Sequence, residues 1–230
     1  LTQDVPSDIT EKIDQLLETH LPYAEDRHHP DWNFRYDTDG LHCSVHKEKP
    51  MIRSIRSTTH HHPVDYLQLL WDLPRILEFE TNVRSQEGLK TYNPHTCLVH
   101  SIYHAVWPTS PRDFASTAHW RLVEHETTGE KALCLVAFSC REASEIKPAA
   151  PDHVRGTLHV SFNFWRPLAE GGCSHTRIIS YDLNGQIPKQ LTQTILQQQA
   201  TLPKVMALYL QTIKPAAVTS TFDMDYDSIY

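Results

Sequence analysis

The chain has 230 residues, of which 40% are hydrophobic and 21% are charged, values that are ordinary for a globular protein. This length suits one large domain or two small ones, and a single core of this size buries roughly 70% of the unfolded chain's surface. The formal net charge is −7, whereas duplex-binding proteins carry a basic face. None of the seven glycines belongs to a loop motif that cradles dinucleotides or nucleoside phosphates. The composition therefore predicts no nucleic-acid partner and no cofactor.

Cysteine usage and hydropathy predict a cytoplasmic protein. The five cysteines are odd in number and no two are spaced C-x-x-C, so neither a disulfide framework nor a zinc ribbon is expected. Reduced thiols are typical of the cytosol. The longest apolar run, 132–138, is far shorter than the roughly 20 residues that a transmembrane helix needs. The start lacks a signal-peptide pattern, and its first residue, Leu1, is compatible with a domain of a longer chain.

The N-terminal third predicts a helix, three strands and two short helical segments. Asp8 precedes an apolar stripe of helical period, so we expect it to cap the first helix. The dipeptide Asp39-Gly40 is typical of a tight hairpin turn. Pro63 and Pro74 each suit the first turn of a short helix. The expected elements are a helix at 8–21, strands at 32–36, 41–46 and 51–59, and short helices from 63 and 74.

The remainder of the chain predicts six strands and a long final helix. The clearest strand is 154–166, where apolar and polar residues alternate, as expected when one face of an antiparallel sheet is dry. Pro188 suits the first position of a final helix that reaches about residue 213 and is kinked at Pro203. The strands are expected at 81–88, 96–107, 113–123, 131–140, 154–166 and 174–183.

This order of elements predicts an α+β fold. Consecutive strands with short turns imply an antiparallel meander with helices segregated to one face. One amphipathic helix cannot fill the concave side of a wide curved sheet, so we expect an internal apolar cavity, the kind of site where small ligands bind. Plain core packing is the alternative for each wall residue. Strand parity assigns to the cavity wall Val99, Tyr103, Ala118, Trp120, Leu158, Val160, Phe162 and Phe164.

No catalytic or metal-binding constellation is evident. Three adjacent histidines at 60–62 cannot all face one metal from a strand, so we expect them at the surface. The chain lacks the G-x-S-x-G motif of serine hydrolases. The carboxylates Glu78, Asp113 and Asp182 are scattered, and a buried carboxylate is more often a structural ion-pair partner than a catalyst. We therefore predict no catalytic residue, no metal and no enzyme activity.

Four short motifs follow one another along the chain. They are W-x₇-G at 32–40 within a hairpin that extends to 45, W-P-T-S-P-R-D-F at 107–114, H-V-R-G at 153–156 and Y-D-L-N-G-Q-I-P at 181–188. In order and spacing they resemble the START domain, the helix-grip lipid-transfer family related to the steroidogenic acute regulatory protein. The resemblance covers about 8–214. We therefore expect a START lipid-binding domain at 1–214 and an acidic, flexible tail at 215–230.

The charged residues of these motifs are interpreted as structural. Arg112 and Asp113 are expected to anchor the end of a strand through an ion pair, and Arg155 to be a solvated or paired surface charge. The resemblance implies a helix-grip fold, in which a curved antiparallel sheet wraps around a long C-terminal helix and encloses a hydrophobic tunnel for one lipid. Burial of an acyl tail contributes ~0.8 kcal/mol per CH₂. It also implies that 188–213 forms a lid that opens at a membrane.

The implied function is binding of a single lipid and its transfer between membranes by a cytoplasmic protein that docks transiently at their surfaces. Within the family the resemblance is nearest to the ceramide-transfer domains, where a Trp-Pro pair on an exposed loop enters the bilayer. Trp107 and Pro108 are therefore the expected membrane contacts, because tryptophan suits the membrane interface. A core tryptophan at a strand end is the alternative interpretation.

The headgroup is less defined by the resemblance. Glu78 aligns with a hydroxyl-binding glutamate of the ceramide-transfer domains, but the three polar partners of that glutamate fall on Ser101, Ala137 and Ile178. A sterol, a ceramide or a glycerophospholipid thus remain alternatives, and a phosphodiester would require an inward arginine, for which location offers Arg75 or Arg177. The predicted lipid-binding residues are Glu78, Val99, Ser101, Tyr103, Trp120, Leu158, Phe162, Ile178 and Met206.

Two other functions remain open at this stage. Some START domains accompany acyl-CoA thioesterases, and related helix-grip folds perform cyclase or hydrolase chemistry, so an enzyme is one alternative. A lipid-sensing regulatory domain of a larger protein is the other. In the tail, 221–225 resembles an acidic signal that docks to receptors of the endoplasmic reticulum, although it lacks the usual second aromatic residue.

Overall fold

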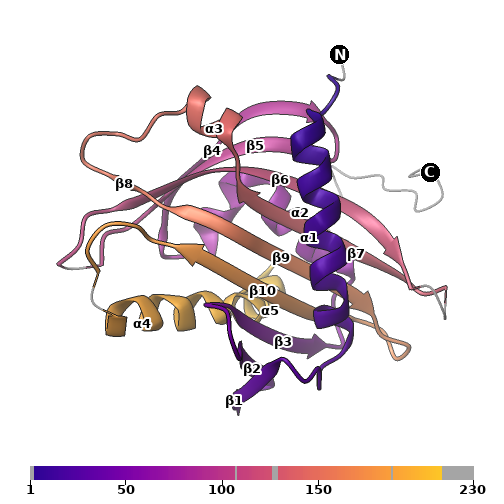
Figure 1. Cartoon of the computed structure of the whole chain (residues 1–230). Coiled ribbons are helices and arrows are strands. Elements are labelled where there is room, and N and C mark those ends of the chain that lie inside the picture. Colours follow the sequence, from indigo (N-terminus) through magenta and orange to yellow (C-terminus); the bar gives the residue numbers. More distant parts are fainter. Residues whose placement is uncertain (1–2, 107, 126–128, 188, 214–230) are drawn as a thin grey trace.

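The computed structural model describes residues 3–106, 108–125, 129–187 and 189–213, in which a curved sheet is flanked by helices on both faces (Figure 1). The strands are β1 (Trp32–Thr38), β2 (Leu41–His46), β3 (Ile52–Thr58), β4 (Val83–Asn93), β5 (Thr96–Tyr103), β6 (Arg112–Glu124), β7 (Lys131–Ser139), β8 (Val154–Arg155), β9 (Thr157–Pro167) and β10 (Cys173–Asp182). The helices are α1 (Ser7–Glu25), α2 (Pro63–Trp71), the 3₁₀ helix η1 (Leu73–Glu78), α3 (Arg141–Ile146), α4 (Lys189–Ala200) and α5 (Leu202–Thr212).

The strand order is β1-β2-β3-β10-β9-β7-β6-β5-β4, and every pair along this path is antiparallel. The short strand β8 pairs with β6 in parallel. Helix α1 crosses one face of the sheet, called the outer face here, whereas α2, α4 and α5 lie on the other, the inner face. The α+β helix-grip prediction is therefore confirmed, and the N-terminal hairpin joins the meander beside β10.

Helix boundaries differ from the prediction in three places. Helix α1 begins at Ser7 after Pro6, and Asp8 lies in the first turn without capping it. The final helix is divided at Thr201 into α4 and α5, because Pro203 has no amide hydrogen to continue the ladder. Helix α3 was not expected, since its six residues are too few to show a helical period; the Sγ atom of Cys140 accepts a hydrogen bond at its start.

Two of the START-like motifs meet at the end of β6 through a buried carboxylate. The Oδ2 atom of Asp113 accepts hydrogen bonds from Arg155, at 2.7 Å, and from His100, at 2.9 Å. Burial alone would raise the pKa of Asp113, but the Arg155 and His100 contacts hold it below its usual range. The expected pairing of Arg112 with Asp113 was therefore wrong: Asp113 pairs with Arg155 instead, because neighbouring residues of a strand face opposite ways.

Arg112 joins the motif at 181–188 to the same strand end. Its guanidinium donates to the backbone carbonyls of Leu183 and Asn184, each at 3.3 Å. The side chain of Asn184 in turn donates to the carbonyl of Arg155 at 2.9 Å. Residues of the motifs at 107–114, 153–156 and 181–188 are thus parts of one contact network.

The glycine of the motif at 153–156 is required for a steric reason. A Cβ atom on Gly156 would lie 2.4 Å from the ring of Phe114, closer than non-bonded carbons approach. The same atom on Gly88, in β4, would make an ordinary 3.5 Å contact with Leu73. The backbone of 156 can therefore pass β6 closely only without a side chain.

We predict that Gly156→Ala lowers the free energy of unfolding by about 1–3 kcal/mol, since the added methyl overpacks the Phe114 ring. The control Gly88→Ala should change it by less than about 0.5 kcal/mol or stabilise slightly, because alanine restricts the unfolded chain. Urea unfolding of the two variants measures this difference. Equal stabilities would contradict the close approach.

Candidate functional site

A cavity of about 1400 Å³, counting the space at its mouth, lies between the inner face of the sheet and the helices α2, η1 and α4. Strands β4 to β7, β9 and β10 contribute side chains to its wall, as does the loop between β5 and β6. Much of the wall is apolar. The large apolar residues on the sheet and on α4 are Val99, Phe114, Leu135, Leu158, Ile179 and Ile195.

The inner face is divided into a hollow part and a solid part. Trp120 and Met206 belong to the solid part, where α2 and α5 pack on the sheet. The Trp120 ring lies against Trp71 and His95, and its Nε1 donates to the carbonyl of Pro94 at 3.1 Å. Strand parity placed Trp120 on the correct face, but the side chain is buried among these neighbours and is not part of the cavity lining. Trp120 and Met206 are therefore core residues that do not line the cavity.

A bulge in β9 moves three of the eight predicted wall residues to the outer face. Ser180 pairs with Val160 while Tyr181 pairs with Leu158, so His159 is an extra residue on β9. An extra residue reverses the alternation of side chains beyond it. Leu158 consequently faces the cavity. Val160, Phe162 and Phe164 pack on the outer face beneath α1.

The same alternation corrects one residue on β10. Ile178 lies in the outer-face core with Phe162. Its neighbours Arg177 and Ile179 line the cavity, because adjacent strand residues face opposite ways. Ile178, predicted to bind the lipid, therefore does not line the cavity, whereas the residues on either side of it do.

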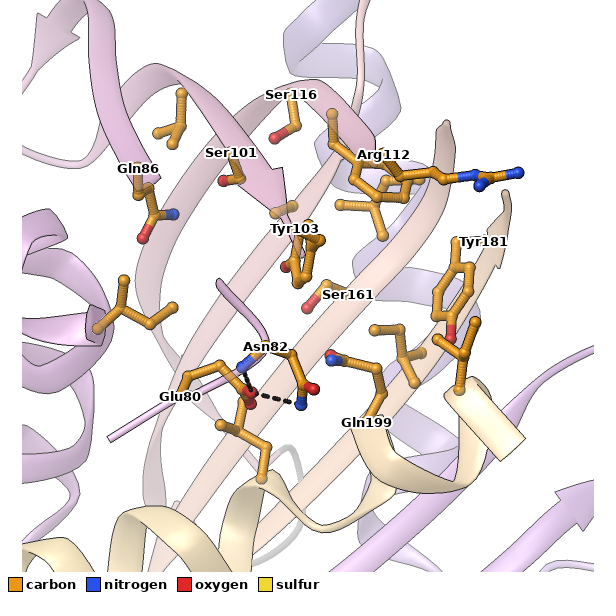
Figure 2. A pocket seen from close by; sticks show the side chains of 18 of the residues that line it. Glu80, Asn82, Gln86, Ser101, Tyr103, Arg112, Ser116, Ser161, Tyr181 and Gln199 are labelled. Carbon is orange, nitrogen blue, oxygen red and sulfur yellow. Dashed lines mark hydrogen bonds between the residues drawn. The ribbon is translucent and has the colours of Figure 1, made fainter. Parts of the chain in front are cut away.

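The acidic group of the cavity is Glu80, not Glu78. Glu78 ends η1, and its carboxylate accepts a hydrogen bond from the Tyr209 hydroxyl outside the cavity lining. Glu80 is 7% exposed and lines the cavity. Its Oε1 accepts from the backbone and side-chain nitrogens of Asn82, at 3.1 and 2.8 Å (Figure 2). Sequence alignment alone could not separate two glutamates that are two residues apart at the end of a 3₁₀ helix.

Four of the predicted binding residues do line the cavity: Val99, Ser101, Tyr103 and Leu158. Ala118 and Ala137 also lie in the wall. Burial raises the pKa of the Tyr103 hydroxyl to about 12, so it stays protonated and can donate a hydrogen bond. Their role in lipid binding remains a prediction.

Polar side chains collect where β9, β10 and α4 meet. Ser161, Tyr181 and Gln199 surround the same part of the cavity as Tyr103 (Figure 2). Arg177 belongs to this group, whereas Arg75 pairs with Asp72 at 3.3 Å and does not line the cavity. The sequence left both arginines as candidates for a cavity residue. The alternation of side chains along β10 places Arg177 in the cavity wall.

The loop between β5 and β6 forms part of the mouth. His104, Val106, Thr109 and Ser110 line the cavity there, and Pro108 is exposed. Trp107, the expected membrane contact, lies outside the described residues, as do Pro188 and the tail at 214–230.

Further features bear on the other sequence predictions. Within the described ranges no group of three His, Cys, Asp or Glu side chains is arranged to hold a metal ion. His60 and His62 are exposed, and His62 caps α2. All five cysteines are free thiols, as predicted. In the part of the chain that the structure covers, no helix is both long and apolar enough to cross a bilayer.

The family described as START domain matches residues 31–206, which is more than half of the chain. This chain belongs to the START family. Membership implies a hydrophobic lipid ligand, without naming it. No curated protein sequence matches the chain.

Solved structures share the START fold. Human StAR-related lipid transfer protein 5 superposes with a TM-score of 0.70 at 19% identity, over 88% of this chain and 98% of that one. A StAR-related lipid transfer protein fragment from Xanthomonas axonopodis gives 0.64 at 20% identity, over 79% and 99%. Human STARD10 gives 0.64 at 14% identity, over 92% and 87%. The narrower resemblance to ceramide-transfer domains is not supported by these comparisons, and Glu78 lies outside the cavity lining.

The β9 bulge predicts that two residues of one expected face respond differently to truncation. Phe162→Ala should lower the free energy of unfolding by about 3–5 kcal/mol, because it empties a packed site under α1. Leu158→Ala should cost only about 1–2 kcal/mol, below the usual range for a packed leucine, since its side chain already borders empty space. Chemical denaturation of both variants measures these losses of stability, which are comparable when the m-value is unchanged. A larger loss for Leu158→Ala than for Phe162→Ala would contradict the assignment of the two faces.

Proposed function

We propose that this START domain binds one lipid in its cavity and transfers it between membranes. The observation that carries the proposal is the cavity of about 1400 Å³ between the inner face and the C-terminal helices. Its largely apolar wall suits an acyl or sterol body, whose burial supplies the driving force for extraction from a bilayer.

The placement of the buried histidine and carboxylate favours a carrier over an enzyme. His100 and Asp113 form a close buried pair. Their strand neighbours Ser101, Arg112 and Phe114 line the cavity, so the pair itself faces away from it. A catalytic pair would have to reach the bound molecule.

Filling the cavity should abolish carriage without unfolding the protein. In Ala137→Phe a ring replaces a methyl in the wall, so we expect at least a tenfold loss of fluorescent lipid transfer from donor to acceptor liposomes. The control Ala149→Phe places the same ring on an exposed loop and should transfer like the parent. Circular dichroism verifies the folding of both variants.

Undiminished transfer by folded Ala137→Phe would contradict the proposed cavity. Lipid binding without any transfer by the parent protein would support the sensor alternative, and turnover of an acyl-CoA would support the enzyme. Extraction of no lipid from any liposome would overturn the proposed function.

The Trp-Pro pair of the β5–β6 loop is proposed as the membrane contact, on the basis of the motif and the exposure of Pro108. We predict that Trp107→Ala lowers the transfer rate about tenfold, while lipid binding measured in detergent-free solution changes less than twofold. Tryptophan prefers the bilayer interface, so its loss should act on docking and not on the cavity. An unchanged transfer rate would show that Trp107 has another role.

A further inference from the structure

Arg177 is a buried cation that pairs with no carboxylate of the residues that the structure describes. Its side chain lies on the cavity wall and the residue is only 5% exposed. Its Nε donates to the backbone carbonyl of Gln199 at 3.2 Å and its Nη2 to the Gln199 side chain at 3.3 Å. Its Nη1 donates to Ser161 at 3.3 Å and to Asn163 at 3.2 Å. All these acceptors are neutral, and no carboxylate of the described residues forms a salt bridge with the guanidinium.

A second buried arginine shows what a purely structural guanidinium looks like in this fold. Arg53, 1% exposed, donates to the backbone carbonyls of Tyr23, Asp26 and Arg27 at 2.7–2.8 Å. It also stacks 4.7 Å above the ring of Trp32. Arg53 is enclosed by short contacts to rigid backbone. Arg177 instead makes long contacts, three of the four to side chains, beside empty space.

An unused hydrogen-bond donor accompanies Arg177. Tyr181, which pairs with Leu158 beside the β9 bulge and is 7% exposed, lines the same cavity, and its hydroxyl has no hydrogen-bond partner among the described residues. Burial raises its pKa, so it remains a neutral donor. A buried polar group without a partner costs free energy, and a ligand oxygen would satisfy it.

The charged groups near Arg177 do not neutralise its positive charge. Glu80 is near enough to raise the pKa of Arg177 but not to pair with it, and its Oε1 is already bonded to Asn82. The hydroxyls of Tyr103 and Tyr181 are neutral at physiological pH. Arg112, the other arginine of the wall, donates to backbone carbonyls. The wall therefore carries more positive than negative charge.

We propose that Arg177 and Tyr181 bind an anionic oxygen group at the head of the carried lipid, a phosphate ester or a carboxylate. This inference rests on the proposed function and names the class of its ligand. A guanidinium presents paired N–H donors that match two oxygens of such a group, and a buried charge is stabilised by an opposite one. A lone sterol hydroxyl would leave the positive charge without a counterion.

The test compares lipids that differ only in the charged group. The full chain is incubated with phosphatidylcholine liposomes that contain equal amounts of phosphatidic acid and diacylglycerol of the same acyl chains, and native mass spectrometry counts the bound lipids. A second pair, oleate and oleyl alcohol, separates a carboxylate from a phosphate. Inorganic phosphate alone serves as a competitor that lacks a tail. We expect at least a tenfold preference for the acidic member of one pair and weak competition by phosphate.

Three variants assign the preference to the named groups. Arg177→Gln should reduce it to less than threefold, whereas Arg53→Gln, which removes a buried arginine outside the cavity lining, should retain it. Tyr181→Phe should reduce it about threefold without loss of thermal stability, since only an unpartnered hydroxyl is removed. This variant keeps the test valid if Arg177→Gln fails to fold.

Two outcomes would overturn the inference. One is binding of diacylglycerol or oleyl alcohol in preference to their acidic partners; the other is an acidic preference that survives both Arg177→Gln and Tyr181→Phe. In either case lipid is still bound, so the carrier function would stand. Failure to bind any lipid would overturn the carrier function itself.

Discussion

The inner face of the sheet is wider than the helices that lie on it, and the site follows from this mismatch. Nine paired strands spaced about 4.8 Å apart extend over almost 40 Å, whereas a helix with its side chains is about 10–12 Å across. The helices α2 and α5 fill one part of the inner face with close-packed side chains. Over the other part, apolar side chains of the sheet and of α4 pack on one another at their edges and leave the cavity between them.

The polar groups of the cavity link its wall to its cover. Arg177 belongs to β10, yet two of its four hydrogen bonds end on Gln199 near the end of α4. The last carbonyls of a helix carry partial negative charge. The end of α4 therefore accepts hydrogen bonds from a guanidinium without supplying a full counter-charge. A molecule that binds Arg177 has to compete with these bonds. If a ligand binds at Arg177 as proposed, occupancy of the cavity and the contacts of α4 with the sheet are coupled, and the coupling is reciprocal.

The sequence predicted the order and type of most elements because their patterns are local. It failed where a single residue changes a long pattern. His159 adds one residue to β9 and thereby moves Phe162 to the outer face, and no local signal separates a bulge from a regular strand. The shift from Glu78 to Glu80 depends on how η1 ends, and Trp120 occupies the solid part because of helices remote in sequence. Strand alternation nevertheless placed Val99, Ser101 and Tyr103 correctly.

The break between α4 and α5 divides the cover into two elements with different freedom. Helix α5 contributes Met206, Ala207 and Leu210 to the solid core, and none of them is more than 1% exposed. Displacing α5 would open that core to water. Helix α4, twelve residues and about 18 Å long, contributes mainly half-buried side chains at the edge of the empty space. A movement of the cover that keeps the core closed to water can therefore involve only α4, which would turn about the break at Thr201 while α5 stays in place.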